Sequence, residues 1–195
     1  WFGFNAGSNL EANGLTVQAF LNTITATAAA ALAWSLVERI TRGHASALGA
    51  ASGAVAGLVA ITPAAGLAGT VGAIALGAVA GVVCLWAVVT LKPMLKYDDS
   101  LDVFGVHGIG GIVGALGTAI VAAPSLNGFG PGGEEYSIGG QLATQATAVA
   151  IAIVWSAVVT VVALLLIKLV MNIRATQQEE IEGLDISSHG EKAYN

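Results

Sequence analysis

Long runs of apolar and small residues, separated by short polar or charged clusters, form the dominant pattern of this chain. Asp, Glu, Lys and Arg are absent between Arg42 and Lys92, and again from Gln141 to Ile167. A helix needs only about 20 predominantly apolar residues to cross a bilayer. These runs therefore predict helices that lie in lipid.

Gly, Pro and charged clusters divide the runs into separate helices. The expected spans are Thr16–Ile40, Ser46–Ile61, Gly69–Leu91, Ser100–Ala122 and Gln141–Ile173, after the last turns of an earlier helix at Trp1–Ser8. At about 1.5 Å per residue, the last of these helices is long enough to project beyond the lipid. The predicted fold class is all-α, a polytopic transmembrane helix bundle over residues 1–173, followed by a tail at 174–195.

The composition supports a membrane protein and excludes an ordinary water-soluble domain. Only 10% of the residues are charged and 55% are hydrophobic, and the mean hydropathy is +0.79. Soluble domains usually have about a quarter of their residues charged. The lipid bilayer is thus the expected surroundings, and no nucleic-acid partner is expected.

The few cations gather at alternate ends of the expected helices. They are Arg39 and Arg42, Lys92 and Lys96, and Lys168 and Arg174. The opposite connections, which contain no Lys or Arg, are Asn9–Leu15, Thr62–Ala68 and Pro124–Gly140. Because Lys and Arg accumulate in cytoplasmic loops, this distribution predicts one topology, with the carboxyl-terminal tail in the cytoplasm.

His107 is an ionisable residue inside a long helix that is otherwise apolar. Such a side chain is expensive to bury in lipid, so it usually faces a protein interior or a pathway for something that crosses the membrane. His107 therefore indicates a transporter or a channel. A satisfied interior histidine is the alternative.

No other group of residues indicates catalysis or metal binding. Cys84 stands alone in an apolar helix, and His44, His107 and His189 lie on separate segments without metal-ligand spacing. No nucleophile or acid–base pair emerges. We expect neither an enzyme nor a metal ion or cofactor.

Many of the glycines have the spacing of helix-packing residues. Gly49, Gly53 and Gly57 form a doubled small-xxx-small pattern, and Gly77/Gly81 and Gly110/Gly114 repeat it. Gly128–Gly133 matches a G-x-G-x-x-G pattern, but it follows no strand and contains Pro131, so we discard it as a nucleotide site.

Three segments, Trp1–Ser8, Asp102–Gly108 and Glu180–Tyr194, together resemble the carboxyl-terminal half of a bacterial ammonium transporter of the Amt family. The resemblance implies a homotrimer with eleven helices per subunit, ten of them in two inverted repeats. This chain is similar to the end of the sixth helix, the second repeat and the long last helix. We therefore expect a fragment or a split subunit of a multi-pass protein of the bacterial cell membrane.

The resemblance also implies roles for individual residues. Phe4 matches one phenylalanine of an outer aromatic gate, Ser8 matches a hydroxyl that holds ammonium, and His107 matches the second of two facing pore histidines. Packing at the lipid interface is the alternative for Phe4. Other positions match residues that line or flank the pore, with ordinary interhelical packing as the alternative: Val55, Thr62, Trp86 and Val103.

Asp99 and Asp102 precede the helix that contains His107. A carboxylate near a helix N-terminus suits the unpaired N–H groups and the positive end of the helix dipole. We expect Asp99 to cap this helix and Asp102 to lie in its first turn, which are structural roles.

The function that the resemblance implies is transport of ammonium or ammonia, by recruitment at the outer vestibule and conduction past pore histidines. An ammonium sensor that signals through its tail is the alternative, although such sensors usually append a long signalling domain. The acidic run at Gln177–Glu182 is typical of a solvated segment. The resemblance raises the alternative that Gly183–Asp185 packs under the trimer and that a PII-type nitrogen-regulatory protein contacts this cytoplasmic face.

Overall fold

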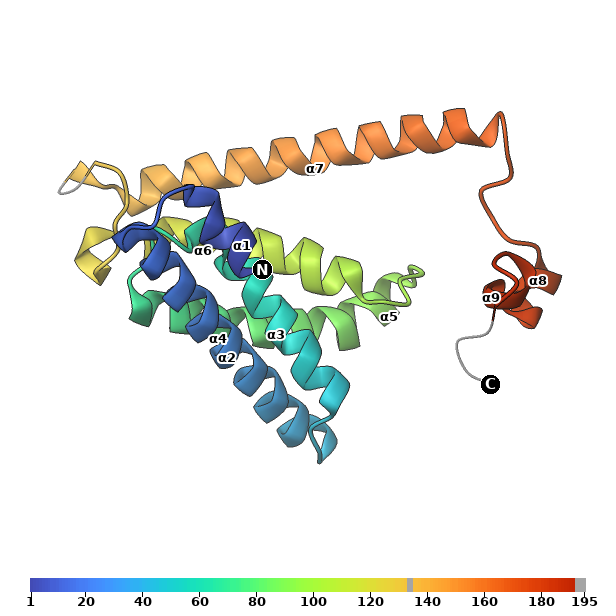
Figure 1. Ribbon diagram of the computed structural model, residues 1–195, viewed down its shortest axis with the longest axis horizontal. Coiled ribbons are helices and arrows are strands. Elements are labelled where there is room, and N and C mark those ends of the chain that lie inside the picture. Colours follow the sequence, from blue (N-terminus) through green and yellow to red (C-terminus); the bar gives the residue numbers. More distant parts are fainter. Residues whose placement is uncertain (133–134, 192–195) are drawn as a thin grey trace. The chain divides into compact units, whose positions relative to one another are not determined.

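A computed structural model describes residues 1–132 and 135–191, and all regular elements within these ranges are helical (Figure 1). The chain divides into two compact units, Trp1–Val149 and Ala150–Asn195. Gly133, which ends the discarded glycine motif, and the last residues of the Glu180–Tyr194 segment lie outside the described ranges.

The first unit opens with two short elements, α1 (Phe2–Asn5) and the 3-10 turn η1 (Gly7–Asn9). The longer elements then follow as α2 (Gly14–Arg42), α3 (Ala47–Ile61), the 3-10 turn η2 (Thr62–Ala64), α4 (Thr70–Trp86), the π-helical segment η3 (Ala87–Leu91), α5 (Lys92–Leu95), the π-helical segment η4 (Phe104–Gly108), α6 (Ile109–Val121) and the 3-10 turn η5 (Pro124–Leu126). Helix α2 packs along both α3 and α4, and α6 packs against α3 and α4.

Within the described ranges, five helical stretches are long and apolar enough to cross a membrane. They are Gly14–Arg42, Ala47–Ala64, Thr70–Leu95, Phe104–Val121 and Ile138–Lys168. The five predicted spans are confirmed as helices, with shifted ends. The last one, α7 (Ile138–Lys168), begins earlier than expected because Ser137 accepts a hydrogen bond from the amide of Gly140 at 3.2 Å.

Polar side chains and glycine set the other ends of the long helices. Asn13 caps α2 by accepting hydrogen bonds from two amides of its first turn, and Ser46 caps α3 by accepting one from Gly49 N at 2.9 Å. Gly43 ends α2 with a φ of 85°, a left-handed conformation that glycine adopts at no steric cost.

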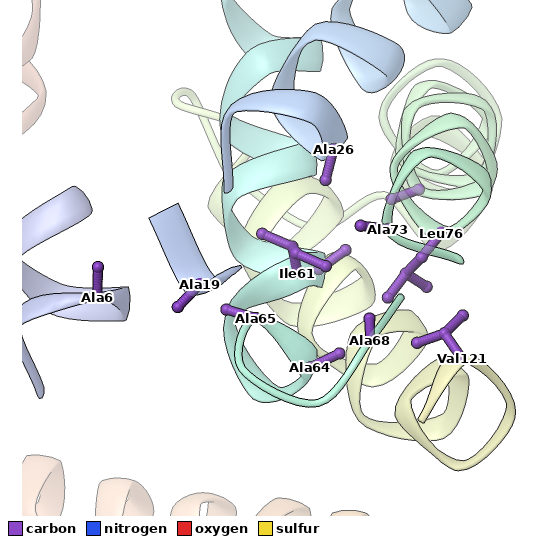
Figure 2. Packing of buried hydrophobic residues seen from close by; sticks show 12 residues of the cluster. Ala6, Ala19, Ala26, Ile61, Ala64, Ala65, Ala68, Ala73, Leu76 and Val121 are labelled. Atoms are coloured by element: carbon purple, nitrogen blue, oxygen red, sulfur yellow. The ribbon is translucent and has the colours of Figure 1, made fainter. Parts of the chain in front are cut away.

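Small residues allow the helices of the first unit to approach closely. A Cβ atom added at Gly77 would lie 2.2 Å from the carbonyl oxygen of Ala26, and one added at Gly114 would lie 2.3 Å from that of Ala60. The packing role predicted for these glycines is therefore confirmed. Figure 2 shows the adjoining core, where Ile61, Leu76 and Val121 from α3, α4 and α6 belong to one buried cluster.

A buried amide fastens the connection between α3 and α4. Asn22 is fully buried, and its Nδ2 donates to the carbonyl oxygens of Ala65 at 2.8 Å and Ala68 at 2.7 Å. These carbonyls lie in irregular backbone, where an unpaired polar group would carry a desolvation cost. Asn22 thus holds the connection that follows η2 against α2.

The second unit contains the carboxyl-terminal part of α7, then α8 (Gln177–Glu182) and α9 (Leu184–Ser187). Thr176 and Glu179 form a capping box at the start of α8. The division between a membrane domain and a tail at residue 173 stays a prediction, although α7 ends nearby, at Lys168.

Candidate functional site

Two groups of residues carry the predicted site. The first, which we call the aromatic end, consists of Trp1, Phe4, Ser8 and Thr62. The indole Nε1 of Trp1 donates to the hydroxyl of Thr62 at 3.0 Å, and that hydroxyl donates to the carbonyl of Leu58 at 2.8 Å. The rings of Trp1 and Phe4 meet edge to face, with centroids 6.1 Å apart. Thr62 therefore positions Trp1, and through it the phenylalanine.

A second threonine anchors the same short helix to α2. Asn5 Nδ2 donates to the hydroxyl of Thr23 at 3.1 Å, and the fully buried Thr23 donates to the carbonyl of Ala19 at 2.6 Å. Phe2 also stacks on Phe20, with ring centroids 4.2 Å apart. Helix α1 is too short to be stable alone, so these contacts fix its position.

The hydroxyl of Ser8 is exposed and donates its hydrogen to the carbonyl oxygen of Phe4. A hydroxyl has one donor hydrogen and two acceptor lone pairs. With its hydrogen engaged in the backbone, Ser8 presents lone pairs to its surroundings. It can accept a hydrogen bond from a cation beside the exposed ring of Phe4.

The second group, which we call the histidine segment, is η4 with His107 near its end. His107 is exposed in this chain, whereas Gly105 and Val106 of the same turn are buried. Val106 belongs to a buried cluster with Trp34 and Cys84, and Val55 packs against that cluster. The histidine segment therefore packs against the rest of the first unit through Val106, while the side chain of His107 is exposed.

The two π-helical segments, η3 and η4, meet at a glycine. A Cβ atom added at Gly105 would lie 2.8 Å from Cγ2 of Val88, so only glycine fits there without a shift. π-Helical turns are rare and occur frequently at functional sites. No pattern in the sequence predicts them.

Charged residues hold the beginning of η4. The Asp99 carboxylate accepts hydrogen bonds from the amides of Val103 at 2.9 Å and Phe104 at 2.8 Å, so its predicted capping role is confirmed. Asp102 was expected in the first helical turn, and this is wrong. It lies just before the helix with a φ of 56°, and its carboxylate contacts Lys92 Nζ at 2.7 Å, because the ion pair with α5 determines its position.

Tyr97 also lies beside the beginning of η4. Its ring meets that of Phe104 edge to face at 5.5 Å. Burial raises the pKa of the Tyr97 hydroxyl, and the neighbouring Asp99 carboxylate raises it further. The phenol is therefore neutral at physiological pH, and its ring serves as a packing surface for the histidine segment.

The structure brings together some of the predicted site residues. Phe4, Ser8 and Thr62 meet at the aromatic end, and Val55 shares the cluster of Val106, the neighbour of His107. Two further side chains, those of Trp86 and Val103, are each 48% exposed. The pore roles of all these residues stay predictions.

Sequence reasoning missed the positioning roles of three residues. Asn5 and Thr23 are polar residues in apolar surroundings, and Lys92 was used only to predict the topology. Their partners are 18 and 10 residues away, however. Only the fold brings those partners into contact.

Comparisons with known sequences identify one family. The family model described as Ammonium Transporter Family matches residues 1–194. The chain is 46% identical over 194 residues to an ammonium transporter of Bacillus subtilis, covering all of this chain and 48% of that protein. It is 48% identical over 195 residues to an ammonium transporter of Aquifex aeolicus, covering 45% of that protein. The chain thus spans about half the length of the curated relatives it matches.

Solved structures agree in fold. A structure titled Sensor Amt Protein matches with a TM-score of 0.87 and 34% identity, over 96% of this chain and 45% of that one. Mep2 of Candida albicans matches with a TM-score of 0.77 and 35% identity, over 92% of this chain and 41% of that one. The predicted fold, a multi-pass helical bundle similar to the second half of this fold, is confirmed. The chain belongs to the ammonium transporter family.

Proposed function

We propose that this chain forms the carboxyl-terminal half of a transporter that moves ammonium or ammonia across a membrane. The observation that carries the proposal is His107, an ionisable side chain exposed on a π-helical turn of a membrane-length helix. In a membrane protein such a residue marks a pathway or a protein interior. Membership of the family makes ammonium the proposed substrate.

Recruitment is proposed to occur at the aromatic end. Ammonium that sheds water needs compensation for its lost hydrogen bonds. The faces of Trp1 and Phe4 can supply a cation–π interaction, which contributes about 0.5–2 kcal/mol. The lone pairs of Ser8 can accept a hydrogen bond from one N–H group of ammonium, because the serine hydrogen is donated to the carbonyl oxygen of Phe4.

Conduction is proposed to occur past His107, with Val55, Trp86 and Val103 lining or flanking the path and Thr62 holding its outer end. A neutral imidazole offers one donor and one acceptor, which suits ammonia or a proton relay. A cationic imidazole would repel ammonium. We propose that ammonium transfers one proton to a water molecule at the outer end, and that the resulting ammonia passes the neutral imidazole. The proposed activity is therefore transport, in line with the family.

The test uses a completed transporter, in which this chain is joined to the part of the Bacillus subtilis relative that it does not cover. His107→Ala leaves an apolar lining that cannot relay a proton, so selective flux into vesicles should be lost or redirected. Folding and assembly should survive. Currents and selectivity equal to those of the unsubstituted protein would refute the role of His107.

A second function, ammonium sensing through the tail, is favoured by one observation, the similarity to the structure titled Sensor Amt Protein. Flux and signalling output in cells that lack other ammonium transporters separate the two functions. A sensor would give ammonium-dependent signalling with flux at the background level. A transporter would give flux that His107→Ala removes.

Assembly, orientation and partners complete the proposal. We infer a homotrimer in the cell membrane, with the carboxyl-terminal tail in the cytoplasm, because cations gather at alternate helix ends. Gly183–Asp185 would pack beneath the trimer, and a PII-type nitrogen-regulatory protein would contact this face. Thiol labelling of a cysteine introduced at Ser188, compared with the unsubstituted chain, whose Cys84 is buried, tests the orientation of the tail.

A further inference from the structure

An ion pair joins the two π-helical segments at their ends. Lys92 is the first residue after η3, and Asp102 lies two residues before η4. Lys92 Nζ is 2.7 Å from Asp102 Oδ1 and also donates to the carbonyl oxygen of Asp99. Both side chains are partly buried, at 27% and 29% exposure. Hence the charged amine of Lys92 bridges the carboxylate of Asp102 and the backbone carbonyl of Asp99, the residue that caps the helix.

Asp102 adopts an unusual backbone conformation for a residue with a side chain. Its φ is 56°, a left-handed value that Asp and Asn tolerate better than most residues. In this conformation its amide donates to Asp99 O at 3.2 Å, and its carbonyl accepts from Val106 N at 2.9 Å. The conformation of Asp102 therefore sets one of the first hydrogen bonds of the helix that contains His107.

We infer that Lys92 and Asp102 are a positioning pair that fixes the direction in which His107 faces, an inference that rests on the transport function proposed above. A π-helical turn holds one more residue in its hydrogen-bonded loop than an α-helical turn. If η4 relaxed to α-helical bonding, the side chains on its two sides would rotate relative to one another. The ion pair holds the start of η4, and the contact of Gly105 with Val88 holds its middle.

The pair touches neither the histidine nor any proposed substrate, so its effect is indirect. An indirect positioning role predicts a loss of turnover without a comparable loss of apparent affinity, because recruitment occurs at the aromatic end. It also predicts rescue by any side chain that keeps the charge. A residue that merely fills space would show neither property.

The first experiment measures ammonium flux through the completed transporter in vesicles. Lys92→Met keeps the length of the side chain without its charge, and Asp102→Asn keeps the left-handed tolerance without the charge. Each should lower the maximal flux by about tenfold, the lower end of the loss known for residues that orient metal ligands, with little change in the half-saturating concentration. Lys92→Arg, which keeps the charge, should retain most of the flux of the unsubstituted protein. Lys96→Met, on an exposed lysine nearby, is the matched control and should have no effect.

The second experiment does not depend on transport. The detergent-solubilised chain is treated with diethyl pyrocarbonate, and modification of each histidine is followed by mass spectrometry. Lys92→Met should change the rate at which His107 is modified and leave the modification rates of His44 and His189 unaltered. Lys96→Met should leave all of them unaltered.

These two readouts separate the inference from the function on which it rests. If the completed transporter carries no flux but the rate at His107 responds to Lys92→Met, the proposed function fails and the positioning pair stands. If flux is normal and neither readout responds to Lys92→Met or Asp102→Asn, the positioning pair is refuted and the function stands. Failure of Lys92→Arg to restore flux in a folded protein would also refute the pair.

Discussion

The aromatic end and the histidine segment are held in place by different kinds of interaction. At the aromatic end, the hydroxyls of Thr62 and Thr23 accept hydrogen bonds from Trp1 and Asn5, and no charge takes part. At the histidine segment, Asp99 and the Lys92–Asp102 pair hold the backbone through charged groups. Neutral hydrogen bonds thus position the short helix that carries the aromatic end, whereas charged groups position the histidine segment.

The largest effect is expected at Ser8, where we propose that ammonium binds. Ser8→Ala in the completed transporter removes one hydrogen bond to a charge, about 1.5–3 kcal/mol at most. The half-saturating ammonium concentration should rise, while flux at saturation changes less. Ser125→Ala on the exposed turn η5 is the control. An unaltered concentration dependence would show that Ser8 takes no part in recruitment.

Replacing Asp99 tests whether charged groups stabilise the histidine segment. Asp99→Ala removes two backbone hydrogen bonds to one carboxylate, so the free energy of unfolding of the chain in detergent should fall by roughly 2 kcal/mol. Asp98→Ala, on the exposed neighbour, should change it little. Equal unfolding free energies for the two variants would mean that the cap does not stabilise the histidine segment.

Thr62→Val tests the contribution of the neutral hydrogen bond at the aromatic end. Valine matches the shape of threonine but cannot accept from the Trp1 indole, so the loss should be about 1 kcal/mol, the net value of a neutral hydrogen bond. The NMR signal of the Trp1 indole proton should move upfield. Thr62→Ser keeps the hydroxyl and should retain both the signal and the stability. A loss as large as that of Asp99→Ala would contradict the difference drawn between the two regions.

The spans could be predicted because their length and polarity are set by the bilayer, a constraint that acts on each run separately. Ends were less certain because they depend on local hydrogen bonds, such as the one between Ser137 and Gly140 that starts α7 early. The two π-helical segments could not be predicted, since bonding to the fifth residue instead of the fourth leaves no periodic trace in so apolar a sequence.

The candidate site likewise contains features that the sequence predicts and features that it does not. His107 could be singled out because an ionisable residue in an apolar run is costly. Asp102 was misplaced because an acidic residue near a helix start favours the first turn, while its real position depends on Lys92, ten residues earlier. The hydrogen bond between Trp1 and Thr62 spans 61 residues, so no local pattern contains it.

The smallest effect is expected at the capping box of α8, where a carboxylate again accepts hydrogen bonds at a helix start, as Asp99 does. The carboxylate of Glu179 accepts hydrogen bonds from the backbone and the side chain of Thr176, at 2.7 and 2.8 Å. These bonds lower the pKa of Glu179 from its ordinary value of 4.5. The cap therefore contributes stability above that ordinary value, and the contribution is lost as the pH falls through the lowered pKa of the folded state.

Amide chemical shifts of Thr176 and Glu179, followed by NMR during acid titration, measure this loss. Glu179→Gln keeps an acceptor for the capping box but cannot titrate, so its shifts should stay constant over the same pH range. Glu182→Gln, at the exposed end of α8, should behave like the unsubstituted chain. Because α8 is a helix of six residues, none of them buried, losing its cap should lower the stability of the chain less than losing the Asp99 cap. A titration midpoint at or above 4.5 would contradict the capping box as the cause of the lowered pKa.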